Sequence, residues 1–498
     1  MLENADREAA ARAAGRGVLW IAAAKAWFMV AGWAIEFALP HLLTAALFGV
    51  WKVVVGAVSV VNNTIVTGTI QAVSKFTSER DADAGVARAA LRVQALVGGA
   101  VAGGFFLAAP LVARFERDAS LTPCLRATAA ITFCYALYAV FVGSANGLRR
   151  FHVQAGLDMS FSTIKAGLVI GAAAAGLGVG GAIGGFVLAS ALILGIAAVA
   201  VGARRATEPF PARRVALFMS QILAYTLLLN LLLLLDLFLV RRFAGEVATA
   251  DEASRQAAYY AAAQTLARIP YQGILAVAFV IFPLVSRSTF AQDRDATRAY
   301  VAQTMRFSLL FCASLAVVFA ANPAAMLGVP YPAEYVAGAP ALAVLAIGQV
   351  FFSIFAIAAT ILNGAGRTGV ALALVAGTLV ASGGLCVLGA RAGSADLLPS
   401  AAAGVALGTA LGGIASLVAL ARTLGATLPL QTALRVMVAF AATVALGRAV
   451  PDGGKLRALL EAALCQATFL GILALMGELS RADLARVRRI LARGQGGG

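Results

Sequence analysis

Charge is scarce in this sequence, because Asp, Glu, Lys and Arg together make up only 12 % of its 498 residues. A soluble globular protein carries about 25 % charged residues, so the composition excludes a water-soluble enzyme built from ordinary domains. Apolar residues reach 61 %, and the mean hydropathy is +0.89. Intrinsic disorder is excluded as well, since disordered chains are poor in hydrophobic residues. The composition indicates a protein that lies in a membrane.

Residues that bind metals and cofactors are also few. The five cysteines lie far apart without a C-x-x-C pair, and the two histidines are His41 and His152. Metal sites need clusters of such residues, so we predict no metal site and no cofactor. The sequence also lacks the phosphate-binding loop G-x-x-x-x-G-K-[ST]. We therefore predict that the chain is not an enzyme and does not bind ATP through such a loop.

Long apolar runs are what the sequence has instead. A transmembrane helix needs about 20 mostly apolar residues, and fourteen runs of this kind follow one another with short connections. The fold predicted from them is that of an all-α polytopic membrane protein. Its predicted spans are residues 17–39, 47–72, 93–113, 127–147, 158–178, 181–203, 215–240, 258–284, 305–327, 338–363, 369–391, 399–421, 431–449 and 457–477.

Basic residues gather in the segments between and around the spans. Residues 1–16 are predicted to be a cytoplasmic amphipathic N-terminus, 204–214 a cytoplasmic linker and 478–498 a basic cytoplasmic tail. With the N-terminus inside, the cytoplasmic segments hold more than twice as many Lys and Arg as the opposite side. Because basic residues stay in short cytoplasmic loops, we predict that both termini are cytoplasmic. This bias accounts for the net charge of +16 without a nucleic-acid partner.

Two short motifs recur at nearly the same spacing. The pattern N-G-x-x-R ends the fourth predicted span at 146–150 and the tenth at 363–367. V-S-K at 73–75 and V-S-R at 285–287 end the second and the eighth spans, at almost the same offset along the chain. Each motif is six spans from its partner, so the repeats run in parallel. The predicted six-helix bundles and the two additional C-terminal helices are residues 17–203, 215–421 and 431–477.

Small residues recur at helical spacing in the twelfth predicted span. Gly404, Gly408 and Gly412 form two overlapping G-x-x-x-G units. Glycine at this spacing lets two helices approach closely within a membrane. We predict that these glycines serve packing inside the protein.

Charged residues inside the spans are the best candidates for function, because a charge at mid-bilayer is costly and usually faces a cavity or a partner. We predict that a cationic lumen between the two bundles binds the substrate through Lys25, Lys52, Lys165 and Arg268. Such a lumen suits a multiply negative substrate such as a pyrophosphate. The alternative is that these groups form structural ion pairs or extend their charged ends to the membrane surface.

Two acidic residues lie at similar depths in equivalent spans. Glu36 has no basic residue within four positions on its own helix, so we assign it to gating or ion coupling. Asp236 is followed closely by Arg241 and Arg242, so we predict a structural ion pair with Arg241. An exchange of protons or Na⁺ at either carboxylate is the alternative, because burial and neighbouring charges shift a carboxyl pKa.

Similarity to a known superfamily is concentrated in the second span (47–51 and 71–76), the seventh span with Asp236 and the residues after it (259–264), and the eighth span (267–272 and 282–284). In these regions, and in its two parallel bundles plus two helices, the chain resembles the MOP (MATE-like) exporters. Within them it looks like the Wzx-type branch of polysaccharide and oligosaccharide flippases. Lys25 stands where lipid II flippases place a cavity-lining basic residue, and Arg268 lies in a helix that carries a cavity arginine in those flippases.

The resemblance implies a flippase that moves a polyprenyl-pyrophosphate-linked oligosaccharide across the bacterial inner membrane by alternating access, for the synthesis of envelope polysaccharide. The implied partners are the lipid-linked glycan, membrane lipids, and a polysaccharide polymerase or glycosyltransferases. Three alternatives stay open, which are an ion-coupled multidrug exporter, a lipid II flippase and a non-transporting scaffold. A cationic lumen argues against cationic drugs as substrates, because like charges repel.

Overall fold

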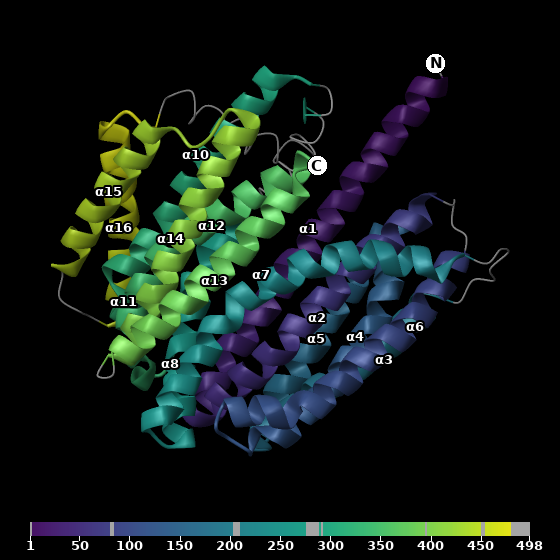
Figure 1. Cartoon of the computed structure of the whole chain (residues 1–498), viewed down its shortest axis with the longest axis horizontal. Helices are drawn as coiled ribbons and strands as arrows, with labels where there is room; N and C mark the ends of the chain where they lie inside the picture. Colours follow the sequence, from purple (N-terminus) through teal and green to yellow (C-terminus); the bar gives the residue numbers. More distant parts are fainter. Residues whose placement is uncertain are drawn as a thin grey trace. The chain divides into compact units, whose positions relative to one another are not determined.

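A computed structural model describes residues 2–79, 84–202, 210–274, 288–289, 292–393, 396–449 and 454–479, without the side chains of 2–19, 84 and 221. Within these ranges the regular structure is helical and no strand occurs (Figure 1). Thirteen helices are long and apolar enough to cross a membrane, and they coincide with thirteen of the fourteen predicted spans. The remaining span, the eighth, includes residues 275–284, which lie outside the described residues. The prediction of an all-α polytopic membrane protein is confirmed.

The chain divides into two compact units, Met1–Ala258 and Tyr259–Gly498. The predicted second bundle begins at residue 215, so the two divisions differ by the whole of α7, which packs against α2 and α3. The division falls inside α8 (Ala250–Ala267). The other helices of the first unit are α1 (Leu2–Leu42), α2 (Ala45–Glu79), α3 (Ala84–Phe115), α4 (Leu121–Gly147), α5 (Phe151–Ala174), α6 (Gly178–Val201) and α7 (Ala212–Val247).

Helix α1 is continuous from Leu2 to Leu42 (Figure 1). The N-terminal segment 1–16 and the first span were predicted as separate elements, and the structure joins all but the first residue of that segment to the span as one helix. Whether that segment is amphipathic lies outside the description, because its side chains are not described.

Helices α2 and α4 lie inside the first unit, and α3 and α6 lie at its surface. Helix α2 packs against α4 and α7, and α4 packs against α3 and α6. Near the C-terminal end of α2, the Phe76 ring packs on Phe210, at 5.3 Å between ring centroids, and on Phe218. Large apolar side chains such as Leu107 of α3 and Val199 of α6 are exposed. Such faces are stable in contact with lipid, since hydrocarbon does not penalise apolar surface as water does.

The first N-G-x-x-R motif connects three helices at one end of the first unit. The Oγ of Ser74 donates to Oδ1 of Asn146 at 2.8 Å, and Nδ2 of Asn146 donates to Oε1 of Gln154 at 2.7 Å. Gly147 lies so close to α2 that a Cβ on it would be 2.7 Å from the carbonyl oxygen of Ser74. The asparagine thus links α2, α4 and α5, and glycine is needed because a larger residue would collide with α2.

The second N-G-x-x-R motif forms the same turn. In the first turn the N–H groups of residues 148, 149 and 150 donate to the carbonyls of 144, 146 and 145. In the second the N–H groups of 365, 366 and 367 donate to the carbonyls of 361, 363 and 362, which is the same pattern at the equivalent positions. The left-handed position is Arg149 in one turn and Gly366 in the other, at φ of 56° and 75°. These matching turns support the predicted repeat, whereas the second copy of the V-S-[KR] motif, at 285–287, lies outside the described residues.

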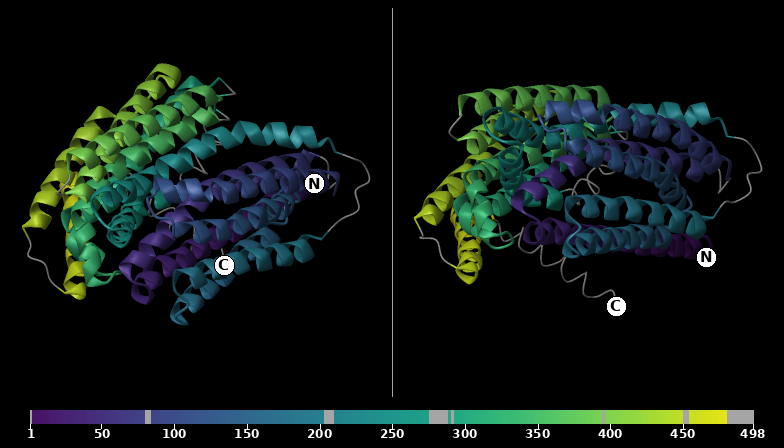
Figure 2. Two further views of the ribbon diagram at one scale, coloured as in Figure 1. Left: turned by 60° about the horizontal axis from the view of Figure 1, so that its bottom comes forward. Right: turned by 90° about the horizontal axis from the view of Figure 1, so that it is seen from below.

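In the second unit, α14 packs against α12 and α13, and α10 packs against α12, α15 and α16. The pair α15 and α16, drawn in yellow-green and yellow, lies side by side (Figure 2). The bounds of the unit's elements after α8 are α10 (Arg294–Ala321), α11 (Pro323–Gly328), η1 (Ala333–Gly338), α12 (Ala339–Gly364), α13 (Thr368–Ala392), α14 (Leu397–Leu424), α15 (Leu430–Arg448) and α16 (Lys455–Leu475).

The G-x-x-x-G units of α14 face α13. A Cβ on Gly404 would collide with the carbonyl of Leu385, and a Cβ on Gly408 would collide with the backbone of Ser382. A Cβ on Gly412 would likewise collide with the side chain of Thr378 in α13. The predicted role of these glycines in internal packing is confirmed.

Glu478 binds the helix pair α15 and α16 to α10. Its carboxylate accepts from Nε of Arg306 at 2.7 Å, from Nη1 of Arg435 at 3.0 Å and from Oγ1 of Thr432 at 2.8 Å. Its carbonyl oxygen also accepts from Nη2 of Arg306. Burial alone would raise the pKa of the Glu478 carboxyl. The hydrogen bonds from these three residues together outweigh burial, so the pKa lies below its ordinary value. The carboxylate is therefore held in its charged form.

Candidate substrate-binding site

Lys25 and Asp158 join α1 to α5 inside the first unit. The Nζ of Lys25 lies 3.2 Å from Oδ2 of Asp158, and the Lys25 side chain is 57 % exposed while that of Asp158 is 13 % exposed. The hydroxyl of Tyr138 in α4 donates to the other oxygen of Asp158 at 3.5 Å. Lys25 is therefore the accessible member of an ion pair whose carboxylate is fixed by a second contact.

Lys52 and Glu36 form a shorter ion pair between α2 and α1. The Nζ of Lys52 donates to Oε2 of Glu36 at 2.8 Å, and both side chains are largely buried. The sequence places no base near Glu36 on its own helix, and the structure supplies one from the next helix. In a medium of low dielectric constant, a direct ion pair is strong while both groups are ionised. Removing the charge of one partner is costly, because the other charge is then buried without compensation.

Lys165 of α5 lies among aromatic rings. Its Nζ is 5.4 Å from the ring centroid of Phe28 in α1, 5.7 Å from that of Phe161 and 5.1 Å from that of Phe186 in α6. An ammonium group within about 6 Å of a ring centroid is attracted by the negative face of the ring. Among the described residues no carboxylate lies within ion-pair distance of this ammonium.

These groups are linked to one another. Lys25 and Lys165 share the ring of Phe28, which lies 5.9 Å from Lys25. Glu36, the partner of Lys52, is close enough to Lys165 to act on its charge. We call Lys25, Lys52, Lys165, Glu36 and Asp158 the lysine cluster. Three ammonium groups face two carboxylates there, so the cluster has an excess of one positive charge when all five groups are ionised.

The lysine cluster has the chemistry of an anion site. A phosphate group can take the place of a carboxylate beside a lysine, because both present charged oxygen acceptors to the same ammonium donor. Lys165 offers a positive charge that no described carboxylate neutralises directly, and Lys25 is open to exchange because its side chain is exposed.

Arg268, the fourth predicted basic residue, belongs to the second unit. It follows α8 at a turn before Pro270, its N–H donates to the carbonyl of Gln264 at 3.1 Å, and its side chain is partly buried. The neighbouring ring of Tyr271 packs edge-on against Phe352 of α12 at 4.9 Å between centroids. The segment that carries Arg268 is thus packed through Tyr271 against helix α12 of its own unit. That it lines one cavity with the lysines stays a prediction.

Asp236 of α7 is buried, and its Oδ1 accepts from the N–H of Leu237 at 3.0 Å. The predicted pair of Asp236 with Arg241 is wrong. Arg241 donates to Oδ2 of Asp118 at 2.7 Å and to Glu116, and Arg242 pairs with Glu246 on its own helix. The spacing along one helix suggested Arg241 as the partner of Asp236. In the structure the loop between α3 and α4 supplies the carboxylates that bind Arg241.

The side chain of Arg241 is fully buried, although the predicted span ends at residue 240. Its Nη1 donates to the carbonyl oxygen of Glu116 at 3.0 Å and lies 3.4 Å from Oε2 of that residue, and its Nη2 donates to Oγ of Ser254 at 2.9 Å. Burial raises the pKa of the Glu116 carboxyl to about 7, although Arg241 and Arg242 lower it. This group of side chains fixes the α3–α4 loop to α7 and α8.

Sequence reasoning missed Asp158 and the three phenylalanines. The fifth span was predicted to begin at residue 158, whereas α5 begins at Phe151, so the aspartate lies two turns inside the helix. The only signal in the sequence was that Asp158 stood at the first position of a predicted span. The rings of Phe28, Phe161 and Phe186 come from three helices, and the sequence has no pattern that brings them together.

One family and several solved structures match the chain. The sequence model of a family described as polysaccharide biosynthesis protein matches residues 38–340. No curated protein matches. An inward-facing multidrug resistance transporter of the MATE family in the MOP superfamily is 16 % identical with a TM-score of 0.65, covering 80 % of this chain and 94 % of that chain.

Two further solved structures have the same architecture. The lipid II flippase MurJ in an inward closed conformation is 12 % identical with a TM-score of 0.70, covering 92 % of this chain and 98 % of that chain. A MOP superfamily transporter from Pyrococcus furiosus, described as having a binding pocket of reverse polarity, is 15 % identical with a TM-score of 0.60, covering 82 % and 95 %. At these identities the likeness shows the fold alone. The MATE-like fold and the resemblance to this superfamily are confirmed.

Proposed function

The chain belongs to the family of polysaccharide biosynthesis proteins, and we propose on this basis that it is a flippase for a polyprenyl-pyrophosphate-linked oligosaccharide. It is a multi-pass membrane protein with the fold of transporters. The proposal places it in the bacterial inner membrane with both termini in the cytoplasm. Its further partners are membrane lipids and a polysaccharide polymerase or glycosyltransferases.

The observation that carries this proposal is the unneutralised ammonium of Lys165 between two ion pairs. A pyrophosphate headgroup is attracted to Lys165 first, because this lysine has no described carboxylate within ion-pair distance. Lys25 then exchanges Asp158 for a phosphate oxygen, as its exposed side chain allows. The pair of Lys25 with Asp158 forms again when the headgroup leaves, so Lys25 regains its counter-charge in an empty site.

Alternating access moves the glycan while the polyprenyl tail stays in lipid. The cytoplasm-open state admits the headgroup, and rocking of one bundle against the other exposes the glycan on the far side. Arg268 is the basic residue that the second unit contributes in this proposal. Without a phosphate-binding loop for ATP, the drive is an ion gradient, the membrane potential or removal of the product.

The test is transport of a lipid-linked oligosaccharide in proteoliposomes by Lys165→Met and Lys165→Arg variants. Methionine keeps the length of the side chain and removes its charge, so we expect transport to fall by about tenfold to a hundredfold, the equivalent of one charge-assisted hydrogen bond. Arginine keeps the charge, so we expect it to retain most of the activity. Arg255→Ala is the matched control, because it removes one positive charge from an exposed i,i+3 pair with Glu252. Equal transport by Lys165→Met and the unchanged protein would contradict the proposal.

An ion-coupled multidrug exporter is the second candidate, favoured by the Glu36–Lys52 pair. A carboxylate that is ion-paired between two helices can couple protonation to movement, because protonation removes the attraction. The same proteoliposomes, with an imposed pH or Na⁺ gradient, therefore carry a cationic dye in a parallel assay. Movement of the dye but not of the glycan would select the exporter, and movement of lipid II alone would select the lipid II flippase. If glycan transport depends on the gradient, we expect Glu36→Gln to lose that dependence.

A further inference from the structure

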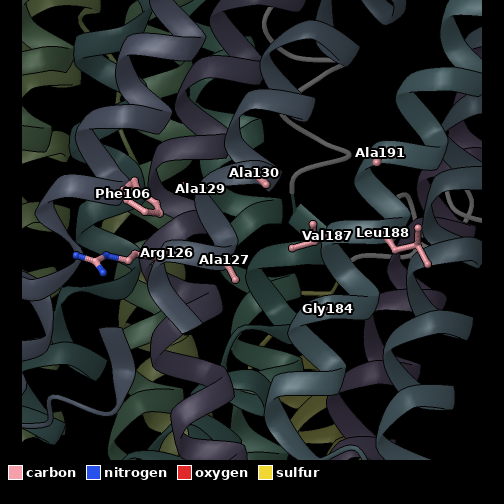
Figure 3. A pocket seen from close by; sticks show the side chains of 9 residues that line it. All are labelled: Phe106, Arg126, Ala127, Ala129, Ala130, Gly184, Val187, Leu188 and Ala191. Carbon is pink, nitrogen blue, oxygen red and sulfur yellow. The ribbon is translucent and has the colours of Figure 1, made fainter. Parts of the chain in front are cut away.

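A cavity lies on the side of the first unit, between α3, α4 and α6. Its volume is about 630 Å³, within the range of about 300–1,000 Å³ that is typical of small-molecule sites. Figure 3 shows Phe106 of α3 and Arg126 of α4 on one side and Val187 and Leu188 of α6 on the other. None of these residues belongs to the lysine cluster.

Arg126 is the charged residue of this cavity, and the others that line it are Ala, Gly, Val, Leu and Phe. Its guanidinium carbon lies 5.0 Å from the ring centroid of Phe106. Within the described part of the chain no carboxylate pairs with Arg126. The cavity therefore combines an apolar wall with one positive charge that is not balanced by a neighbouring acid.

The cavity extends along α4 and α6 from near the helix ends at Leu121 and Gly178. Arg126 is five residues after Leu121, the first residue of α4, which places it about 7 Å from the helix end. On α6 the lining reaches Ala191, thirteen residues after the helix begins at Gly178, or about 20 Å along the axis. Because transmembrane helices begin near a membrane surface, we expect the charge at headgroup depth and the apolar part at hydrocarbon depth.

The surface around the cavity is apolar as well. Leu107 is 74 % exposed and Leu188 is 49 % exposed, and both lie on the helices that form the cavity. Side chains of this kind face hydrocarbon in a membrane protein, so the cavity is reached from the bilayer and not from water. A ligand that enters from the bilayer with a negative charge at headgroup depth is an anionic lipid.

We propose that this cavity binds one anionic phospholipid, with its phosphate on Arg126 and one acyl chain along the groove between α4 and α6. The lipid is a resident of the protein and not the transported substrate, because it occupies the outer face of the helices and leaves the lysine cluster free. Arg126 selects anionic over zwitterionic headgroups, as basic pockets between transmembrane helices do.

The experiment measures lipid binding by native mass spectrometry of the whole protein, titrated with phosphatidylglycerol or with phosphatidylcholine. For Arg126→Ala we expect binding of phosphatidylglycerol to weaken about fivefold, the effect of one basic residue near a membrane surface. Arg114→Ala is its matched control, since Arg114 is an exposed base in the last turn of α3 that does not line the cavity.

A second pair of variants tests the groove itself. A Cβ on Gly184 meets nothing within 4 Å, so Gly184→Leu fills the cavity without disturbing the fold, and we expect it to abolish binding of phosphatidylglycerol. Gly195→Leu is its control, because Gly195 is equally unobstructed on the same helix and does not line the cavity. The unfolding temperature of each variant is measured to verify that it is folded.

Four results would overturn the proposal. Unchanged binding in Gly184→Leu would place the lipid elsewhere, and equal losses in Arg126→Ala and Arg114→Ala would show general surface attraction. Equal affinity for phosphatidylcholine would remove the role of the charge. Displacement of phosphatidylglycerol by the lipid-linked oligosaccharide at equal concentration would make the cavity part of the transport site, which contradicts a resident lipid.

Discussion

The ion pair of Arg241 and Glu116 shows how a single buried charge is accommodated at the end of the first unit. Nη2 of Arg241 has two good acceptors, Asp118 and Ser254, whereas the longer contact from Nη1 goes to Glu116. Oε1 of Glu116 and Nε of Arg241 have no hydrogen-bond partner in the described structure. Glu116 is therefore the member of this group that gains most from protonation, since a neutral carboxyl costs less to bury than a charged one.

We expect Glu116→Gln to remove a pH dependence of stability. The pKa of Glu116 is about 7 in the folded protein against 4.5 for an unperturbed carboxyl, so the folded state binds the proton more tightly. The unchanged protein thus gains stability as the pH falls through 7 towards 4.5, by about 3 kcal/mol. The glutamine variant lacks this gain and is the more stable of the two at pH above 7.

Unfolding temperatures of the purified protein, scanned at one rate across this pH range, measure the effect. Glu252→Gln is the control, because that carboxyl is partly exposed on α8. An unchanged pH profile in Glu116→Gln would show that another group carries the dependence.

For individual residues, the sequence predicted whether a side chain lies within a span but not which side chains it contacts. Hydropathy alone placed Lys25, Lys52 and Lys165 within spans, because each interrupts an apolar run. Their partners were not predictable, since Asp158 is 133 residues from Lys25 and the rings around Lys165 come from three helices. Contacts within one helix follow from spacing, but contacts between helices depend on how the helices pack.

Helix ends were predicted less well than helices. The third span was predicted from residue 93, but α3 begins at Ala84 and carries Arg88 and Arg92. Charged residues end an apolar run without ending a helix, because arginine is a good helix former and the chain continues into the headgroup region. The twelfth span was better defined, since its glycines indicated both a helix and a close neighbour.

At the level of two packed helices, we expect Gly408→Ala to destabilise the second unit by about 1–3 kcal/mol. The added methyl group would collide with the backbone of Ser382, which cannot move without shifting α13. Gly377→Ala is the matched control on α13, because nothing lies within 4 Å of its added Cβ. There we expect no loss, and a small gain in helix stability.

Thermal unfolding in detergent distinguishes these two variants. Equal unfolding temperatures for Gly408→Ala and the unchanged protein would mean that α13 and α14 separate without cost.

For the whole molecule, the prediction that remains is orientation. The excess of Lys and Arg on one side predicts that both termini lie in the cytoplasm. Reporter fusions at Arg16 and after Glu478 are expected to give cytoplasmic signals, and a fusion at Arg117, between α3 and α4, the opposite one. Signals from opposite sides for the two termini would require an odd number of spans.

The fold class followed from composition, and short motifs predicted the repeat. The division of the chain between Ala258 and Tyr259 did not, because no change in hydropathy marks it. It falls inside helix α8, so the boundary reflects which residues pack together and not where an element ends.

The matching turns at 146–150 and 363–367 also align the two helices that follow them. Helices α5 and α13 begin directly after them, at Phe151 and Thr368, and so keep the same offset. At this offset Asp158 corresponds to Val375, and Lys165 corresponds to Ser382, which packs against Gly408 of α14. If the halves descend from one duplicated gene, α5 kept or gained the charged residues that an anion site needs. Its counterpart α13 has small residues at these positions, which allow it to pack closely against α14. A comparison of related sequences at these two pairs of positions would date the specialisation relative to the duplication.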